Sequence, residues 1–165
     1  MATNFERAFT ERPEVYAAWQ QLNGAIKARM DLRRYELATF AAAQRLRSSY
    51  CSLAHGKVLR DQLGEQPAEI ARDRSTLDPV DRAVMDLAEE VVGDATSISD
   101  SDVQPLRELG LSETDIMDIV LAASARCFFS KTLDALGVLP DASYADEFPP
   151  DELDVLVAGR PIAES

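Results

Sequence analysis

Residues 36 to 55 read ELATFAAAQRLRSSYCSLAH, and this stretch decides the predicted fold. Apolar residues at helical spacing predict one helix over residues 32–46. Ser48 or Ser49 can cap a following helix, which is predicted to end near Gly64, a residue type favoured just beyond a helix C-terminus. A break between residues 46 and 49 would let the two helices fold against each other as a hairpin.

The rest of the chain carries further helix signals. Four more helices are predicted from caps and apolar spacing: one that begins at Pro13, one that opens at Asp78-Pro79 and continues through Val92, a short one from Ser99 to Gly110, and a long one from Ser112 to Gly137. No stretch alternates convincingly with period two, so we predict an all-α protein without a sheet.

The 165 residues fit one domain with a hydrophobic core. We predict an all-helical domain over residues 1–138 and a C-terminal tail, residues 139–165, that packs on its surface. The tail contains Pro140, Pro149, Pro150 and Pro161, which leave room for at most one short helix, around residues 151–157.

Composition excludes several functions. With 17 basic and 29 acidic residues the net charge is −12, which disfavours binding to nucleic acid or to an anionic membrane. No segment reaches the length of apolar sequence that spans a bilayer, and residues 1–12 lack the apolar core of a secretory signal. Two cysteines do not make a disulfide scaffold, and a single histidine cannot build a multi-imidazole metal site within one chain. We therefore expect a cytoplasmic protein without bound metal or cofactor.

The segment from Ile116 to Phe129 is apolar nearly all round. Such a helix is central to the core, or it is buried by another subunit. In a small domain the outer face of this helix is hard to cover, which favours both together and predicts a homo-oligomer.

One constellation could carry chemistry. Cys51 and His55 are four residues apart and share a helix face, and a cap at Ser48 or Ser49 would place Cys51 in the first turn, where the helix dipole favours a thiolate. His55 could accept the thiol proton. In a folded hairpin Glu36 could approach His55 and orient it, as in a nucleophilic triad. The alternative is a buried cysteine, a structural histidine and a solvated glutamate.

At these residues the chain resembles the AhpD-like superfamily, which includes alkylhydroperoxidases and carboxymuconolactone decarboxylases. Redox members carry a glutamate followed by Cys-x-x-Cys-x-x-x-His, and the matching positions here are Glu36, Ser48, Cys51 and His55, with Tyr50 before the cysteine. The resemblance continues through DRAVMDLAEE at residues 81–90, LRELGLSETDIMDIV at residues 106–120, residues 136–138 and residues 159–162. It therefore covers most of the chain.

The resemblance implies an AhpD-like helical domain and a thiol-dependent peroxidase. In such a peroxidase Cys51 attacks a hydroperoxide while His55 and Glu36 relay the proton. Ser48 stands where the resolving cysteine would be, and a serine cannot form the disulfide. Resolution would need an external thiol, another subunit's cysteine, or Cys127.

The resemblance also leaves alternatives open. A non-redox lyase of the decarboxylase type would use His55 and Glu36 on a carboxylate substrate, with Cys51 incidental. A third possibility is a catalytically inactive member of the family. The resemblance further implies a homo-oligomer, as a trimer or a hexamer. For Cys127 we expect a packed core cysteine, because free cysteines are often buried. The alternative role as resolving thiol would require its Cα to lie within about 7 Å of the Cys51 Cα.

Overall fold

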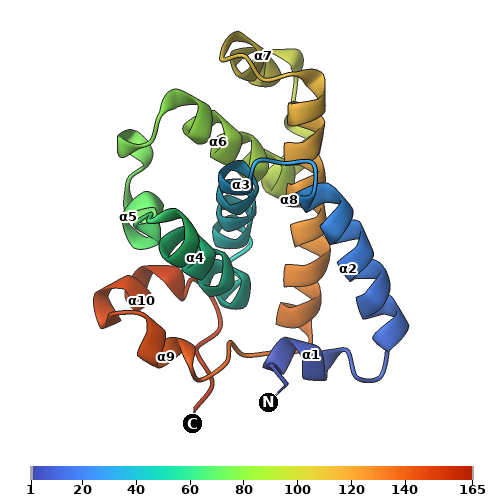
Figure 1. The fold of residues 1–165 in the computed structure, drawn as a ribbon, viewed down its shortest axis with the longest axis vertical. Helices are drawn as coiled ribbons and strands as arrows, with labels where there is room; N and C mark the ends of the chain where they lie inside the picture. Colours follow the sequence, from blue (N-terminus) through green and yellow to red (C-terminus); the bar gives the residue numbers. More distant parts are fainter. Residues whose placement is uncertain (1, 165) are drawn as a thin grey trace.

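The computed structural model describes residues 2–164, which form helices joined by turns and loops (Figure 1). The helices are α1 (Asn4–Ala8), α2 (Pro13–Lys27), α3 (Leu32–Arg45), α4 (Ser49–Leu63), α5 (Pro67–Arg72), α6 (Pro79–Asp94), α7 (Asp100–Glu108), α8 (Glu113–Ala135), α9 (Tyr144–Glu147) and α10 (Pro150–Leu156), with short 3₁₀ turns η1 (Arg74–Thr76) and η2 (Ala95–Ser97). No strand occurs within this range, so the predicted all-α fold is confirmed.

Helix α3 is the centre of the molecule. It packs against α4, α6 and α8, and every residue from Tyr35 to Ala43 is buried. Small side chains at Ala41, Ala42 and Ala43 let the neighbouring helices approach closely, while Phe40 fills the core between them. Because α3 is covered on all sides, even its Glu36 carboxylate lies inside the protein, with 1% of its surface exposed.

The chain reverses between α3 and α4, where the break was predicted. Arg47 adopts a left-handed backbone with φ of 56°, and the Ser48 N–H donates to the Ala43 carbonyl at 2.9 Å. The C-terminal tail holds this turn, since Arg47 Nε donates to the Ala158 carbonyl at 3.1 Å. A β-carbon on Gly159 would lie 1.9 Å from the Arg47 carbonyl oxygen, so only glycine fits there.

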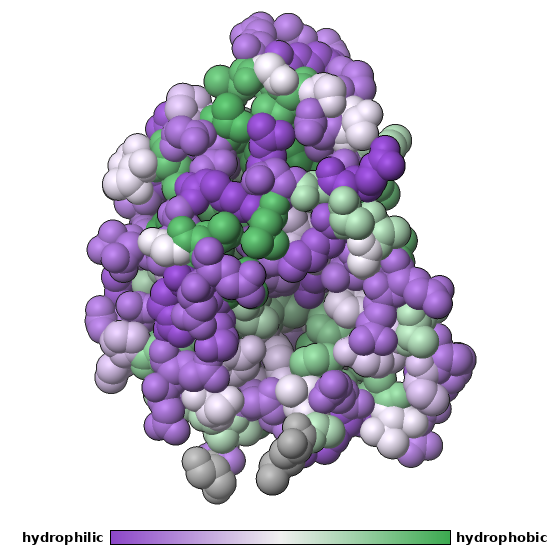
Figure 2. Space-filling model, viewed as in Figure 1, coloured by the Kyte–Doolittle hydropathy of each residue, from purple (hydrophilic) through white to green (hydrophobic). Residues whose placement is uncertain are grey.

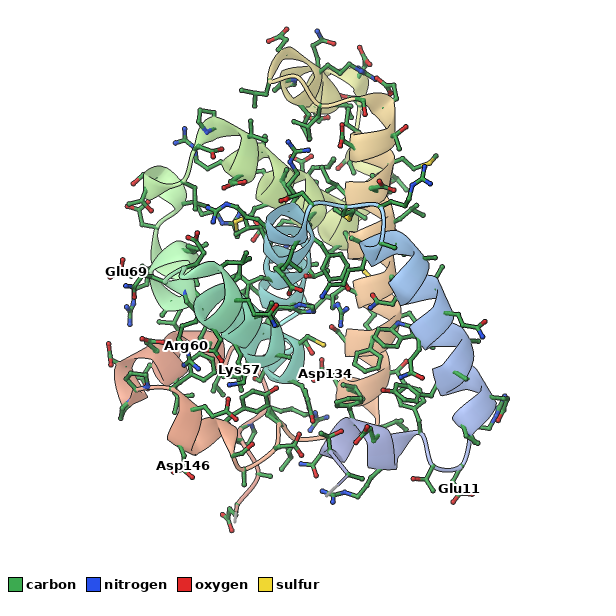
Figure 3. The ribbon with its side chains drawn as sticks, in the orientation of Figure 1. Glu11, Lys57, Arg60, Glu69, Asp134 and Asp146 are labelled. Atoms are coloured by element: carbon green, nitrogen blue, oxygen red, sulfur yellow. The ribbon has the colours of Figure 1, made fainter. Side chains whose placement is uncertain are left out.

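The tail differs from the prediction in two respects. It contains two short helices, α9 and α10, rather than at most one, and it buries Phe148 and Leu156 in the core. Lys57 and Arg60 extend from α4 toward this tail (Figure 3), and Arg60 Nη1 donates to the Glu147 carbonyl at 2.6 Å while its guanidinium covers the Phe148 ring. Apolar anchoring and these polar contacts explain why a proline-rich segment is ordered against α4.

The long helix α8 has two different faces. Its inner face is buried against α2, α3 and α6, whereas Met117, Leu121 and Phe128 on the outer face are 62%, 40% and 45% exposed. The predicted central helix is therefore covered on one side only within a single chain. No helix in the described part of the chain is both long and apolar enough to cross a membrane.

Candidate active site

The α3–α4 hairpin brings Glu36, Cys51 and His55 together. Ser48 is the N-cap residue of α4, although its hydroxyl makes no capping hydrogen bond, and Cys51 is the third residue of the helix. The prediction that Cys51 lies in a first helical turn is confirmed. His55 follows one turn later on the same helix, and Glu36 reaches it from α3.

Glu36 and His55 form a buried hydrogen-bonded pair. Glu36 Oε2 lies 2.7 Å from His55 Nδ1, and the other carboxylate oxygen accepts from Lys27 Nζ at 2.9 Å. Thr39 Oγ1 also lies 3.1 Å from His55 Nδ1, but its hydroxyl proton is donated to the Tyr35 carbonyl at 2.7 Å. Both neighbours of Nδ1 are thus acceptors, so Nδ1 carries the proton and Nε2 is left with a lone pair.

The surrounding charges keep this imidazole neutral. Burial and the positive charge of Arg126 lower the pKa of His55, against the opposing effect of Glu36. Burial alone would raise the pKa of Glu36, but its hydrogen bond to His55 and its contact with Lys27 hold that pKa below the ordinary value. An ionised carboxylate beside a neutral imidazole is the state expected of a base that is held in place by an acceptor.

Arg126 is a site residue that the sequence analysis did not identify. It projects from α8, is 3% exposed, and places Nη1 3.5 Å from the Cys51 sulfur. Its guanidinium also lies against the rings of Trp19 and Phe129, 5.7 and 5.5 Å from their centroids. Arg126 thus places a buried cation beside the Cys51 thiol.

These side chains face one cavity of about 250 Å³ between α4, α2 and the inner face of α8. Figure 2 shows this side of the molecule hollowed between α4 and α2. The wall is largely aromatic, and the residues that define it are Phe5, Tyr16, Trp19, Tyr35, Tyr50, Phe129 and Tyr144, together with Glu36, Cys51, His55, Lys27 and Arg126. A larger depression of about 520 Å³ on α6 is lined mainly by charged side chains and contains none of the predicted site residues.

The remaining candidates lie in different surroundings. The Tyr50 ring lines the cavity, but its hydroxyl donates to Asp141, and burial raises its pKa, so it stays protonated. Ser48 is fully buried and lies outside the cavity lining. Cys127 is half-buried, does not line the cavity, and has a pKa raised by burial. Both cysteines are free.

Within residues 2–164 no group of three or more candidate ligands is arranged to hold a metal ion.

Comparison with known proteins gives a family match for part of the chain. Residues 13–72, which include the hairpin, match the model of the carboxymuconolactone decarboxylase family. No curated protein matches the chain.

Two solved structures share the fold. One is described as an alkylhydroperoxidase AhpD core, an uncharacterized peroxidase-related protein from Ralstonia eutropha JMP134, with a TM-score of 0.78 and 18% identity over 97% of this chain and 84% of that one. The other is an uncharacterized peroxidase-related protein from Silicibacter sp. TM1040, with a TM-score of 0.78 and 22% identity over 87% of this chain and 79% of that one. The predicted resemblance is confirmed, because the family model matches residues 13–72 and the two solved structures have the same helical fold.

Proposed function

We propose that the protein is a thiol-dependent oxidoreductase that reduces hydroperoxides through Cys51. The observation that carries this proposal is the position of the Cys51 sulfur, 3.5 Å from a buried guanidinium and in the same cavity as a neutral, carboxylate-held His55. A cation that stabilises the thiolate and a base that accepts its proton are the two requirements of an activated cysteine. The names of the two structural neighbours refer to peroxidases and point the same way.

The chemical step follows from these roles. His55 Nε2 takes the thiol proton, and the thiolate attacks the terminal oxygen of the hydroperoxide. The S–O bond forms as the O–O bond breaks, so the sulfur is oxidised to a sulfenic acid while the peroxide is reduced. The departing alkoxide takes the proton from His55 and leaves as an alcohol. Glu36 keeps the imidazole oriented while it is transiently charged.

Regeneration needs a thiol from outside this cavity. Ser48 occupies the family's resolving position, and Cys127 lies outside the cavity lining with a raised pKa. An external thiol would therefore attack the sulfenic acid, release water and form a mixed disulfide, which a second thiol then reduces. A reducing cytoplasm, the compartment predicted from the cysteine content, would supply such a thiol.

A lyase remains the second candidate, because the Glu36–His55 pair faces the cavity whether or not Cys51 reacts. General acid–base work by this pair on a carboxylate substrate would need no thiol. The two functions differ in their dependence on Cys51, since Cys51→Ser would abolish the first and spare the second.

Peroxide titration followed by mass spectrometry tests the proposal. The protein is treated with hydrogen peroxide or cumene hydroperoxide in the presence of dimedone, which traps sulfenic acids. We expect a stoichiometric adduct on Cys51 in the wild type and in Cys127→Ser, and none in Cys51→Ser. An unmodified Cys51 at peroxide levels that already oxidise Cys127 would contradict the proposal and favour the lyase or an inactive protein.

We further propose that the protein forms a homo-oligomer, a trimer or a hexamer, through the exposed apolar face of α8. The support is the row of Met117, Leu121 and Phe128 on that face.

A further inference from the structure

The buried positive charge of Arg126 needs a counter-ion whenever Cys51 is protonated. Its side chain is 3% exposed, and no carboxylate of residues 2–164 pairs with it. Its Nη1 lies 3.5 Å from the Cys51 sulfur, and Arg126 Nε has no partner among the described residues. A buried charge without a hydrogen-bonded counter-ion is costly, so its retention calls for an anion at this position.

A second unpartnered donor lies on the same cavity. Trp19 Nε1 is buried and has no acceptor in the described part of the chain, and Trp19 lines the cavity beside Arg126. Indole N–H groups that are buried usually find a partner. Two residues that line one cavity, one of them cationic, thus each carry a buried donor without an acceptor among the described residues.

The charged side chains that line the cavity carry one net positive charge. Lys27 is paired with Glu36, which removes one positive and one negative charge from the balance. Arg126 then remains as a single positive charge in a protein of net charge −12. An anionic ligand in the cavity would neutralise this charge.

The aromatic lining and the volume of the cavity indicate the size and character of the rest of the ligand. Trp19 stacks on Phe129 with centroids 4.0 Å apart, and Phe5, Phe9 and Tyr16 continue this aromatic cluster. A cavity of about 250 Å³ is smaller than the roughly 300–1,000 Å³ of sites for drug-sized molecules. It therefore suits a ligand about the size of one ring.

We propose that this cavity binds small aromatic carboxylates, with the carboxylate on Arg126 and Trp19 Nε1 and the ring against the aromatic wall. The carboxylate supplies the counter-ion that Arg126 lacks among residues 2–164. The inference that such a carboxylate takes part in the thiol chemistry rests on the proposed function. The binding of the carboxylate does not require Cys51.

Fluorescence of Trp19, the single tryptophan of the chain, tests the proposal directly. The probes are benzoate and its neutral isostere benzamide, titrated at pH 7 into the wild type, Cys51→Ser and Arg126→Met, with Trp19→Phe to confirm the source of the signal. We expect Cys51→Ser to bind benzoate about tenfold or more tightly than benzamide, because a hydrogen bond to a charged group is involved. The wild type should show the same preference, and Arg126→Met should show none.

Equal affinities for benzoate and benzamide in Cys51→Ser would overturn the proposal, and this comparison does not depend on Arg126→Met being folded. A benzoate preference that survives in a folded Arg126→Met would also overturn it. If benzoate binds as expected while peroxide leaves Cys51 unmodified, the binding site stands and the peroxidase proposal fails. If peroxide oxidises Cys51 but benzoate is not preferred, the binding site fails and the peroxidase proposal stands.

Discussion

The two cysteines have the same chemistry and very different surroundings. Cys51 lies in the first turn of α4, in an aromatic cavity, 3.5 Å from a buried guanidinium and one turn from a neutral histidine. Cys127 lies mid-helix in α8, where burial raises its pKa and only the weak influence of Lys131 opposes this effect. Cys127 follows Arg126 directly in the sequence, yet it does not line the cavity, because successive residues of a helix point in different directions. Reactivity is set by the side chains that the fold assembles around a thiol, and Cys127 serves as an internal control for Cys51.

The largest difference between the two thiols should come from His55. Replacing it with Gln removes the base, and we expect the alkylation rate of Cys51 by iodoacetamide to fall about 10²-fold at pH 7 while that of Cys127 is unchanged. Glu36→Gln should give a smaller loss, because the base remains but loses its orientation. Lys57→Gln, an exposed position on the same helix, is the matched control. Peptide mass spectrometry measures both rates in one sample.

The pH profile sharpens this prediction. His55 acts as a base only when neutral, and burial together with Arg126 lowers its pKa below the ordinary 6.5. Neutral His55 therefore persists as the pH falls through 6.5, and assistance should be lost only at a lower pH. If the difference between wild type and His55→Gln disappeared at pH 6.5, or if both thiols reacted alike throughout, the assigned role of His55 would be wrong.

A smaller change is expected from introducing a second thiol at position 48, where redox members of the similar superfamily carry one. Ser48→Cys places a thiol three residues before Cys51, and because the Ser48 hydroxyl makes no capping hydrogen bond to α4, the substitution removes no helix cap. We expect a disulfide between the introduced thiol and Cys51 after peroxide treatment. Turnover of peroxide with dithiothreitol should rise about tenfold, since resolution becomes intramolecular.

Ser49→Cys is the matched control for this gain. Ser49 is also buried, but its hydroxyl accepts from the Gly159 N–H at 2.8 Å and so faces the tail. A thiol there should form no disulfide with Cys51. Equal turnover in the two variants would mean that the gain does not depend on placing the introduced thiol at position 48.

The parts of the molecule that were predicted depend on neighbours in the sequence. Caps and apolar spacing locate α2, α3, α4, α6, α7 and α8, because each signal lies within a few residues of the feature it specifies. The contact of Glu36 with His55 was predicted as soon as a break near Ser48 was expected. The short helices α1, α5 and α9 were missed, since such short segments contain too little periodicity to register, although Thr3 and Glu6 form a capping box.

Arg126 was missed for a different reason. It lies 75 residues from Cys51 in the sequence, and only the packing of α8 across the hairpin brings the two together. One signal was present: Arg126 is the only basic residue between Ile116 and Phe129 in an otherwise largely apolar segment. A lone cation in a buried helix is expensive enough to indicate a functional site.

The smallest expected effect concerns the environment of Cys127. The exposed apolar residues of α8 include Phe128, its direct neighbour, and an oligomer built on that face would reduce the access of reagents to Cys127. Leu121→Glu places a charge in the middle of the face, so we expect light scattering to report a smaller particle and Cys127 alkylation to rise a few-fold, with Cys51 little changed. Leu22→Glu, the same substitution at an exposed leucine of α2, should alter neither. A wild-type protein that is already monomeric at micromolar concentration would reject the assembly, and the low reactivity of Cys127 would then reflect burial within one chain alone.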